Sequence, residues 1–157
     1  MRILGIDPGF AIVGYGVIDY DGNKARSVEY GAITTPAGQK ISVRLKTIYD
    51  ETVKIIQQYK PDSVAIEELF FNTNVKTAIM VGQARGVLIL ASENNNVPSF
   101  EYTPLQVKQA VVGYGRADKN QVQQMVKLLL DLPEIPKPDD TADALAIAIC
   151  HAHSIRY

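Results

Sequence analysis

The chain has 157 residues, of which 46% are hydrophobic and 21% are charged, a composition typical of a globular domain. This length predicts one domain over residues 1–157, large enough for a sheet with helices packed on it. The formal net charge of −1 excludes a uniformly basic protein, although a basic surface can still form locally in a chain that is neutral overall.

The sequence shows no sign of export or of membrane insertion. Met1–Ile6 is too short for a signal sequence and ends at Asp7-Pro8, and no apolar run approaches the ~20 residues of a membrane span. The single cysteine, Cys150, excludes an internal disulfide and is expected to be a buried thiol. Together these features predict a cytoplasmic protein.

Three strands are predicted at the start of the chain. Residues 3–6 form a short apolar run that ends at the turn signal Asp7-Pro8-Gly9. Residues 11–20 and 25–35 follow as further strands, with Asp21-Gly22 as a hairpin turn between them. Because the connections are short, these strands should form an antiparallel meander.

The rest of the chain combines helices with two more strands. Apolar residues at spacings of three and four predict a helix over 41–59, and a buried strand follows at 63–66. A further helix, a strand and three helices are expected at 75–94, 97–102, 104–112, about 122–130 and 140–153. This order predicts an α/β sandwich with a mixed sheet.

Two acidic side chains stand where buried strands end. Asp7 follows the first strand, and Glu67 follows the strand at 63–66. A carboxylate at an apolar sheet edge loses hydration, which is unfavourable unless a cation lies nearby. Neighbouring residues of a strand face opposite ways, so only one of Glu67 and Glu68 can point into such a site. Glu67 is favoured because it continues the strand, whereas Glu68 is expected to face solvent.

A second pair of acids lies at the start of the last predicted helix. Asp140 and Asp143 are three residues apart and share one helix face. They also occupy the first turn, so a plain capping role for Asp139 or Asp140 stays open. Together with the strand-end acids they offer the hard oxygen ligands that Mg²⁺ or Mn²⁺ needs. A pair of such ions about 4 Å apart would support in-line displacement at phosphorus.

Five motifs run through the chain in order. They are Gly5-Ile6-Asp7-Pro8-Gly9, Ala65-Ile66-Glu67-Glu68, Gly82-Gln83-Ala84-Arg85-Gly86, Val107-Lys108-Gln109-Ala110-Val111-Val112-Gly113 and Asp140-Thr141-Ala142-Asp143-Ala144-Leu145-Ala146. Taken together, over essentially the whole chain, they resemble the RuvC family of crossover junction endonucleases. The first motif alone is a weak signal, because sugar kinases and actins share a similar element.

The resemblance implies an RNase H-like fold, with a mixed five-stranded sheet flanked by helices. It implies a magnesium-dependent homodimer, with one or two ions per subunit and Mn²⁺ as a substitute, that makes symmetric nicks in a four-way (Holliday) junction. By motif position it places the catalytic, metal-binding acids at Asp7, Glu67, Asp140 and Asp143. The branch-migration proteins RuvA and RuvB are the implied partners. Glu68 departs from the family pattern, which has a neutral residue there.

Basic residues gather between residues 104 and 130, where the chain has four cationic residues and one anionic residue. Cations at this density, beside the loop Gly113-Tyr114-Gly115-Arg116, would position a phosphate backbone without reading its sequence. The resemblance favours Lys108 and Lys119 as phosphate contacts or as groups that stabilise the transition state. Arg116 is expected to be a further DNA contact.

An aromatic pair, Phe70-Phe71, follows Glu67 in a polar loop. Burial is the ordinary role of an aromatic side chain, but two neighbours are hard to bury together. One of them would then be free to stack on the bases of the junction or to wedge between them. Phe70 is favoured, because the family has an aromatic residue at that place.

Two glycines four residues apart, Gly82 and Gly86, interrupt the predicted helix at 75–94. Each costs roughly 1 kcal/mol of helix stability relative to alanine, so close packing should compensate. That packing is either against the chain's own sheet or against a second subunit, as an enzyme that cuts two related strands requires. His151 and His153, near the end of the last helix, are expected to add only solubility, with a supporting role for His151 left open.

Other classes of protein fit parts of the sequence. The glycines around Asp7 also suit a kinase-like ATPase, but that class needs two such domains, and the sequence has no G-x-x-x-x-G-K-[ST] loop. A silent junction-binding scaffold would lack one of the four acids, and all are present. A general ribonuclease H stays open on fold alone.

Overall fold

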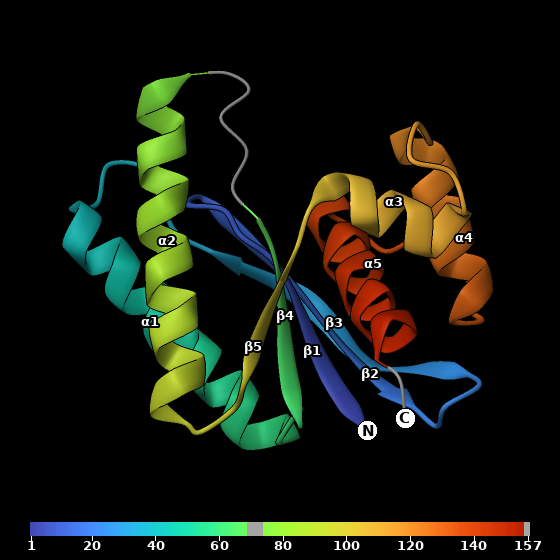
Figure 1. The fold of residues 1–157 in the computed structure, drawn as a ribbon. Coiled ribbons are helices and arrows are strands. Elements are labelled where there is room, and N and C mark those ends of the chain that lie inside the picture. The colour runs from blue at the N-terminus through green and yellow to red at the C-terminus, as the bar shows by residue number, and fades with distance from the viewer. Residues whose placement is uncertain (69–73, 156–157) are drawn as a thin grey trace.

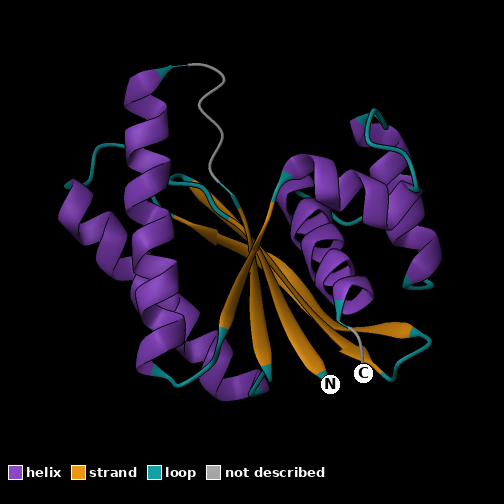
Figure 2. Ribbon diagram, viewed as in Figure 1, coloured by secondary structure: helices purple, strands orange, loops and turns teal. Residues whose placement is uncertain are grey.

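The computed structural model describes residues 1–68 and 74–155 of the chain. Within these residues, one sheet lies between two layers of helices, as Figure 1 and Figure 2 show. Its strands follow one another in the order β3-β2-β1-β4-β5. Their bounds are β1 (Arg2–Asp7), β2 (Ile12–Tyr20), β3 (Ala25–Thr34), β4 (Ser63–Glu67) and β5 (Ser99–Tyr102).

The sheet is mixed, as expected. β1, β2 and β3 are antiparallel neighbours, and the predicted hairpin turn has Gly22 at a φ of 99°. β4 instead runs parallel to β1, and β5 runs parallel to β4. Parallel neighbours need a long crossover connection, which the helices between these strands supply.

Helices cover both faces of the sheet (Figure 1). One face carries α1 (Ile41–Tyr59) and α2 (Val75–Asn94), and the other carries α3 (Pro104–Val112), α4 (Lys119–Leu129) and α5 (Asp139–Ser154). Both α3 and α4 begin with a capping box, in which Thr103 and Asp118 accept a hydrogen bond from the amide three residues on. Such boxes fix where a helix starts.

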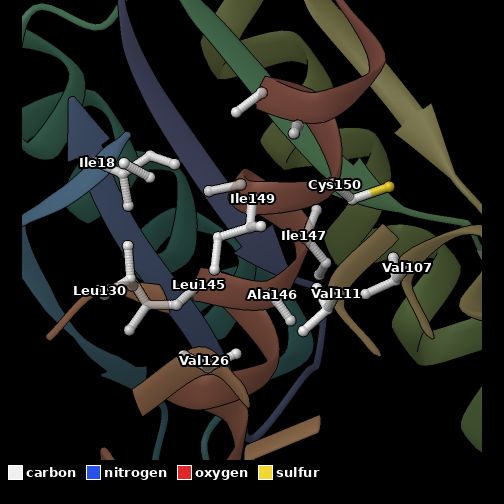
Figure 3. Packing of buried hydrophobic residues seen from close by; sticks show 14 of the residues in the cluster. Ile18, Val107, Val111, Val126, Leu130, Leu145, Ala146, Ile147, Ile149 and Cys150 are labelled. Carbon is white, nitrogen blue, oxygen red and sulfur yellow. The ribbon is translucent and has the colours of Figure 1, made fainter. Parts of the chain in front are cut away.

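The core beneath α3 and α4 is built around α5. Eleven of the sixteen residues of this helix are buried, and Leu145, Ile147 and Ile149 are at most 1% exposed. Figure 3 shows these side chains among Ile18 of β2 and Val111 of α3. A helix that is apolar on nearly every side suits a place between a sheet and other helices. Burial at roughly 25 cal/mol per Å² of apolar surface therefore holds α5 firmly in position.

Glycines of β1 and β2 let α5 lie directly on the sheet. A Cβ built on Gly5 would lie 2.1 Å from the carbonyl oxygen of Ala144, and one on Gly14 would lie 2.0 Å from that of Asp140. Atoms in a packed interior do not approach so closely, so a larger residue at either place would push the helix away. This contact sets the distance between the start of α5 and the strand ends.

The helix α2 presents apolar side chains to solvent as well as to the sheet. Val75, Ile79 and Leu90 are 68%, 57% and 52% exposed. By length and composition alone α2 is apolar enough to cross a membrane. An 18-residue stretch of this helix has a mean hydropathy of 1.2, and 28% of the stretch is buried. The expectation that no apolar run approaches the length of a membrane span is therefore wrong for α2. The few charged residues of this helix interrupt the apolar run in the sequence, but they do not lower its mean hydropathy enough to exclude a span. Core helices of globular proteins meet the same criterion.

His151 lies in the core, so the expectation that it adds only solubility is wrong. It is 1% exposed, and its Nδ1 and Nε2 form hydrogen bonds with the hydroxyls of Tyr102 at 2.7 Å and Ser63 at 2.9 Å. Burial lowers the pKa of this imidazole from 6.5 to about 4. The three side chains tie α5 to β4 and β5. His153 is exposed, and Cys150 is buried as expected.

Candidate metal-binding active site

Asp7 and Glu67 lie at the same edge of the sheet. Asp7 is the last residue of β1 and Glu67 is the last residue of β4. The two strands are parallel neighbours, with Ile6 opposite Ile66, so their final residues meet at one edge. Both acids are partly buried, whereas Glu68 is exposed, as expected.

The first turn of α5 brings Asp140 and Asp143 to this edge. Gly14 of β2 is the register partner of Asp7, and the backbone of Asp140 packs against the same glycine. The N-cap of α5 is Pro138, and no side chain caps the helix with a hydrogen bond. The capping role that was left open for the acids of this turn is therefore excluded.

The carboxyl groups disfavour one another's ionisation. Burial raises the pKa of Asp7 to about 9, and the charges of Asp143, Glu67 and Asp140 add to this effect. Burial also raises the pKa of Glu67 to about 7, again with a contribution from Asp143. The pKa of Asp143 is raised chiefly by burial as well, although Lys119 opposes the shift. Desolvated like charges of this kind are what a multivalent cation relieves.

Two lysines face these acids. Lys119 Nζ lies 3.4 Å from Asp139 Oδ2 and 3.5 Å from Asp143 Oδ2. Lys108 and Lys119 both favour the ionised form of Glu67. These lysines, Glu67 and Asp143 line a cavity of about 270 Å³. The cavity is completed by residues of α3, α4 and α5 and of the segment before α4, namely Pro104, Val107, Ala117, Asp118, Val122 and Ala146.

Comparison with known proteins decides the family. The family model described as crossover junction endodeoxyribonuclease RuvC matches residues 3–151. The chain belongs to the RuvC family. A relative of that name from Alkaliphilus oremlandii is 68% identical over 154 residues, which cover 98% of this chain and 94% of the relative. Another, from Ruminiclostridium cellulolyticum, is 62% identical over 156 residues, or 99% of this chain and 94% of the relative.

Solved RuvC structures have the same fold. Thermus thermophilus RuvC has a TM-score of 0.91 at 38% identity, covering 98% of this chain and 94% of that one. T. thermophilus RuvC in complex with Holliday junction substrate has a TM-score of 0.93, also at 38% identity, covering 98% and 93%. The expected RNase H-like fold is confirmed. The chain is thus an endodeoxyribonuclease of a metal-dependent family, and the kinase-like alternative is set aside.

The other predicted site residues that the structure describes in this RuvC-family chain differ in their exposure and in their surroundings. Arg116 is exposed, and it is not among the described residues that line the cavity beside the acids. Phe70 lies outside the described residues. Gly86 is exposed and has no atom within 4 Å of a Cβ built on it, so packing against its own sheet does not explain this glycine. Gly82 is partly buried.

Three contributions to the site of this RuvC-family chain were not predicted. Gly14 seats the first turn of α5, Asp139 pairs with Lys119, and Arg85 Nε donates to the carbonyl oxygen of Glu67 at 3.0 Å. A signal existed for two of them. Glycines two apart in a strand, as at Gly14 and Gly16, leave one face of the strand flat, and an arginine in an apolar helix needs an acceptor.

The donor set suits a hard divalent cation, because it consists of carboxylates that repel one another where they stand. Among the described residues, no group of three or more acidic, histidine or cysteine side chains stands close enough to hold one ion. The four acids are thus electrostatic neighbours rather than an assembled set of ligands.

Proposed function

We propose that this chain resolves four-way DNA junctions by hydrolysing phosphodiester bonds where Asp7, Glu67, Asp140 and Asp143 gather. The observation that carries the proposal is the meeting of four acids at one edge of the sheet, two from the ends of β1 and β4 and two from the first turn of α5. Burial and the neighbouring acids raise the pKa of Asp7 there to about 9. Such a cluster destabilises the metal-free fold, and acids held together at this cost are typical of a functional site. The related T. thermophilus RuvC in complex with Holliday junction substrate supports the junction as the substrate.

The same acids would hold Mg²⁺, as one or two ions per subunit, with Mn²⁺ as a substitute. An ion held by these carboxylates would supply Lewis acidity, which favours the activation of water and the stabilisation of the leaving oxygen in an in-line displacement at phosphorus. Asp7 and Glu67 offer their carboxylates from strand ends, and Asp140 and Asp143 offer theirs from a helix packed into the core. Rigid elements of this kind limit how far each ligand has to move.

Lys119 and Lys108 would contact the phosphates beside the acids. In the free protein Lys119 pairs with Asp139 and Asp143 at 3.4 and 3.5 Å, and its side chain is 55% exposed. Exposed ion pairs are weak, so this ammonium group is free to turn towards a phosphate. Arg116 would position the DNA backbone further out, and Phe70 would stack on the bases of the junction or wedge between them.

A homodimer would form through the outer face of α2. Ile79, Gly86 and Leu90 share this face by their spacing of seven and four residues, and all three are exposed. The open space at Gly86 would let a second α2 approach closely, with Gly82 one turn earlier. A two-fold contact presents two identical sites, as paired nicks require. It would also cover the apolar surface of α2 without a membrane.

The setting follows from the substrate. An enzyme that cuts a four-way junction works beside the proteins that move the junction, and the resemblance to the RuvC family implies RuvA and RuvB in that role. We infer that both are partners of this chain. Because the substrate is cellular DNA, we also infer that the protein acts in the cytoplasm.

One cleavage assay tests this function. The protein is incubated with a synthetic four-way junction, a plain duplex and an RNA–DNA hybrid, with Mg²⁺ and with chelator. We expect paired nicks in the junction alone, and only with Mg²⁺. Glu67→Gln should abolish cleavage while junction binding persists, and Glu68→Gln, which changes the exposed neighbour, should alter neither. Cleavage of the hybrid instead, or cleavage in chelator, would refute the proposal.

A further inference from the structure

The end of β4 is held by the sheet on one side only. The pairing of β1 with β4 ends at Ile6 and Ile66. On the other side, Glu67 is the register partner of Tyr102 in β5, and the amide of Glu68 donates to the carbonyl oxygen of Tyr102 at 2.8 Å. The bond to Tyr102 engages only the N–H of the peptide that follows Glu67, so a second contact at its carbonyl oxygen would restrict that peptide further.

Arg85 of α2 supplies that contact. Its Nε donates to the carbonyl oxygen of Glu67 at 3.0 Å, and its Nη2 donates to Glu101 Oε1 at 2.6 Å. The Arg85 side chain is 15% exposed, whereas that of Glu101 is 45% exposed. One guanidinium group thus bridges the end of β4 and the neighbouring strand β5. Its planar fork orients both acceptors, which the single ammonium group of a lysine does not do.

The contact acts on the direction of Glu67 rather than on its charge. The carbonyl oxygen belongs to the planar peptide that follows Glu67, so holding it also limits the direction of the Cα–Cβ bond. A misplacement of about 1 Å in a catalytic site can cost on the order of 10²-fold in rate. The ion pair with the exposed Glu101 contributes little stability by itself, and so it does not explain why an arginine stands here.

We propose that Arg85 is a positioning residue, which holds the end of β4 so that the carboxylate of Glu67 can reach the metal. This inference rests on the proposed function, because Glu67 is assigned there as a metal-binding acid. Arg85 also belongs to α2 and precedes the exposed Gly86. The helix that would pair with a second subunit therefore also supports the catalytic edge of its own subunit.

Arg85→Met tests the inference, since methionine keeps part of the aliphatic stem and removes both donors. Single-turnover cleavage of a four-way junction is measured across a range of Mg²⁺ concentrations, and junction affinity is measured in chelator. We expect the maximal rate to fall by at least about tenfold and the Mg²⁺ midpoint to rise, with junction affinity unchanged. The Mg²⁺ midpoint for the rise in Tm should shift the same way, and it reports on the site without cleavage.

Three further variants distinguish an effect on the position of Glu67 from an effect on folding. Arg85→Lys keeps the charge and one donor, so its cleavage rate and Mg²⁺ midpoint should lie between those of Arg85→Met and the wild type. Arg26→Met changes an exposed arginine of β3 and should match the wild type. Glu101→Gln weakens the ion pair but leaves the bond to Glu67 in place, so its rate should stay closer to that of the wild type than the rate of Arg85→Met does.

Equal rates and equal Mg²⁺ midpoints in Arg85→Met and the wild type would overturn the inference. A loss of rate that merely follows a loss of junction affinity would overturn it as well. If Arg85→Met does not fold, Arg85→Lys decides by the same measurements. A wild-type protein that cuts no junction would instead contradict the proposed function, so the two failures are distinguishable.

Discussion

If Asp7 binds metal as proposed, it is the residue at which stability and function conflict most directly. Its pKa is raised from 3.8 to about 9, because of burial and of the acids around it. Between these pH values the folded, metal-free chain keeps a proton that the unfolded chain releases, so stability falls as the pH rises. Glu67, whose pKa is raised from 4.5 to about 7, acts in the same direction over a narrower range.

We therefore expect Asp7→Asn to stabilise the metal-free protein at alkaline pH while abolishing cleavage. Asparagine has nearly the same shape and carries no charge, so both the burial cost and the repulsion disappear. In chelator, the Tm of the wild type should fall more steeply than that of the variant from about pH 5 to pH 9. A variant less stable than the wild type throughout this range would contradict the explanation.

His151 gives the opposite dependence on pH. Its pKa is lowered from 6.5 to about 4 by burial, so in this window the unfolded chain binds a proton that the folded chain does not. The contribution of His151 to stability is therefore lost as the pH falls from 6.5 towards 4.

His151→Gln should remove this sensitivity to acid, at the cost of the ring contact with Phe100, whose centroid lies 4.6 Å away. Asp7 and Glu67 have raised pKa values, so their contributions to the stability of the protein increase towards acid pH. The informative quantity is therefore the difference in the free energy of unfolding between the variant and the wild type. Urea unfolding at matched pH values measures it. If the free energy of unfolding of both proteins depends equally on pH below neutrality, His151 is not the group responsible.

Among the elements, α5 serves both the core and the site, and its position depends on Gly14. A methyl group on Gly14 would lie 2.0 Å from the carbonyl oxygen of Asp140, so Gly14→Ala must displace the first turn of α5. We expect the cleavage rate to fall on the order of 10²-fold and the free energy of unfolding to fall by about 1–3 kcal/mol. Val28→Ala, on the exposed part of β3, is the control. An unchanged rate would mean that the acids tolerate the displacement.

The periodicity of apolar residues predicted the helices and strands well, but it did not predict which of them contact one another. The helices predicted at 41–59 and 104–112 coincide with α1 and α3, because the burial pattern and the turn residues that define them are local. The hydrogen bond of His151 to Ser63 spans 88 residues. A periodic pattern reports which face of an element is buried, but not which element covers it.

In the candidate site, too, the sequence identified residues with a local pattern and missed those that depend on distant contacts. Strand ends indicated Asp7 and Glu67 directly, since a carboxylate after a buried strand is unusual. Asp140 was ambiguous until the N-cap of α5 was located at Pro138. Arg85, an arginine in an apolar helix, indicated that an acceptor must lie nearby, but the sequence could not identify it, because the acceptor is the backbone carbonyl of Glu67.

For the whole molecule, the exposed face of α2 predicts the oligomeric state. Leu90→Glu would place a charge on the proposed dimer face of α2, where Leu90 is 52% exposed, and should convert the protein to a monomer, as measured by sedimentation. We expect a monomer to make single rather than paired nicks. Leu128→Glu, at a leucine of α4 that is 71% exposed, is a matched control and should stay dimeric. A Leu90→Glu protein that remains a dimer would place the interface elsewhere.

The acids of the site are far apart along the chain, with Asp7 in the first strand and Asp143 in the last helix. During synthesis β1 precedes α5, so the edge proposed to bind metal lacks two of its acids until α5 has emerged. That same helix supplies the apolar layer that covers one face of the sheet. Because domains fold as units during synthesis, we expect the nascent chain to have no nuclease activity until α5 has emerged and packed on the sheet.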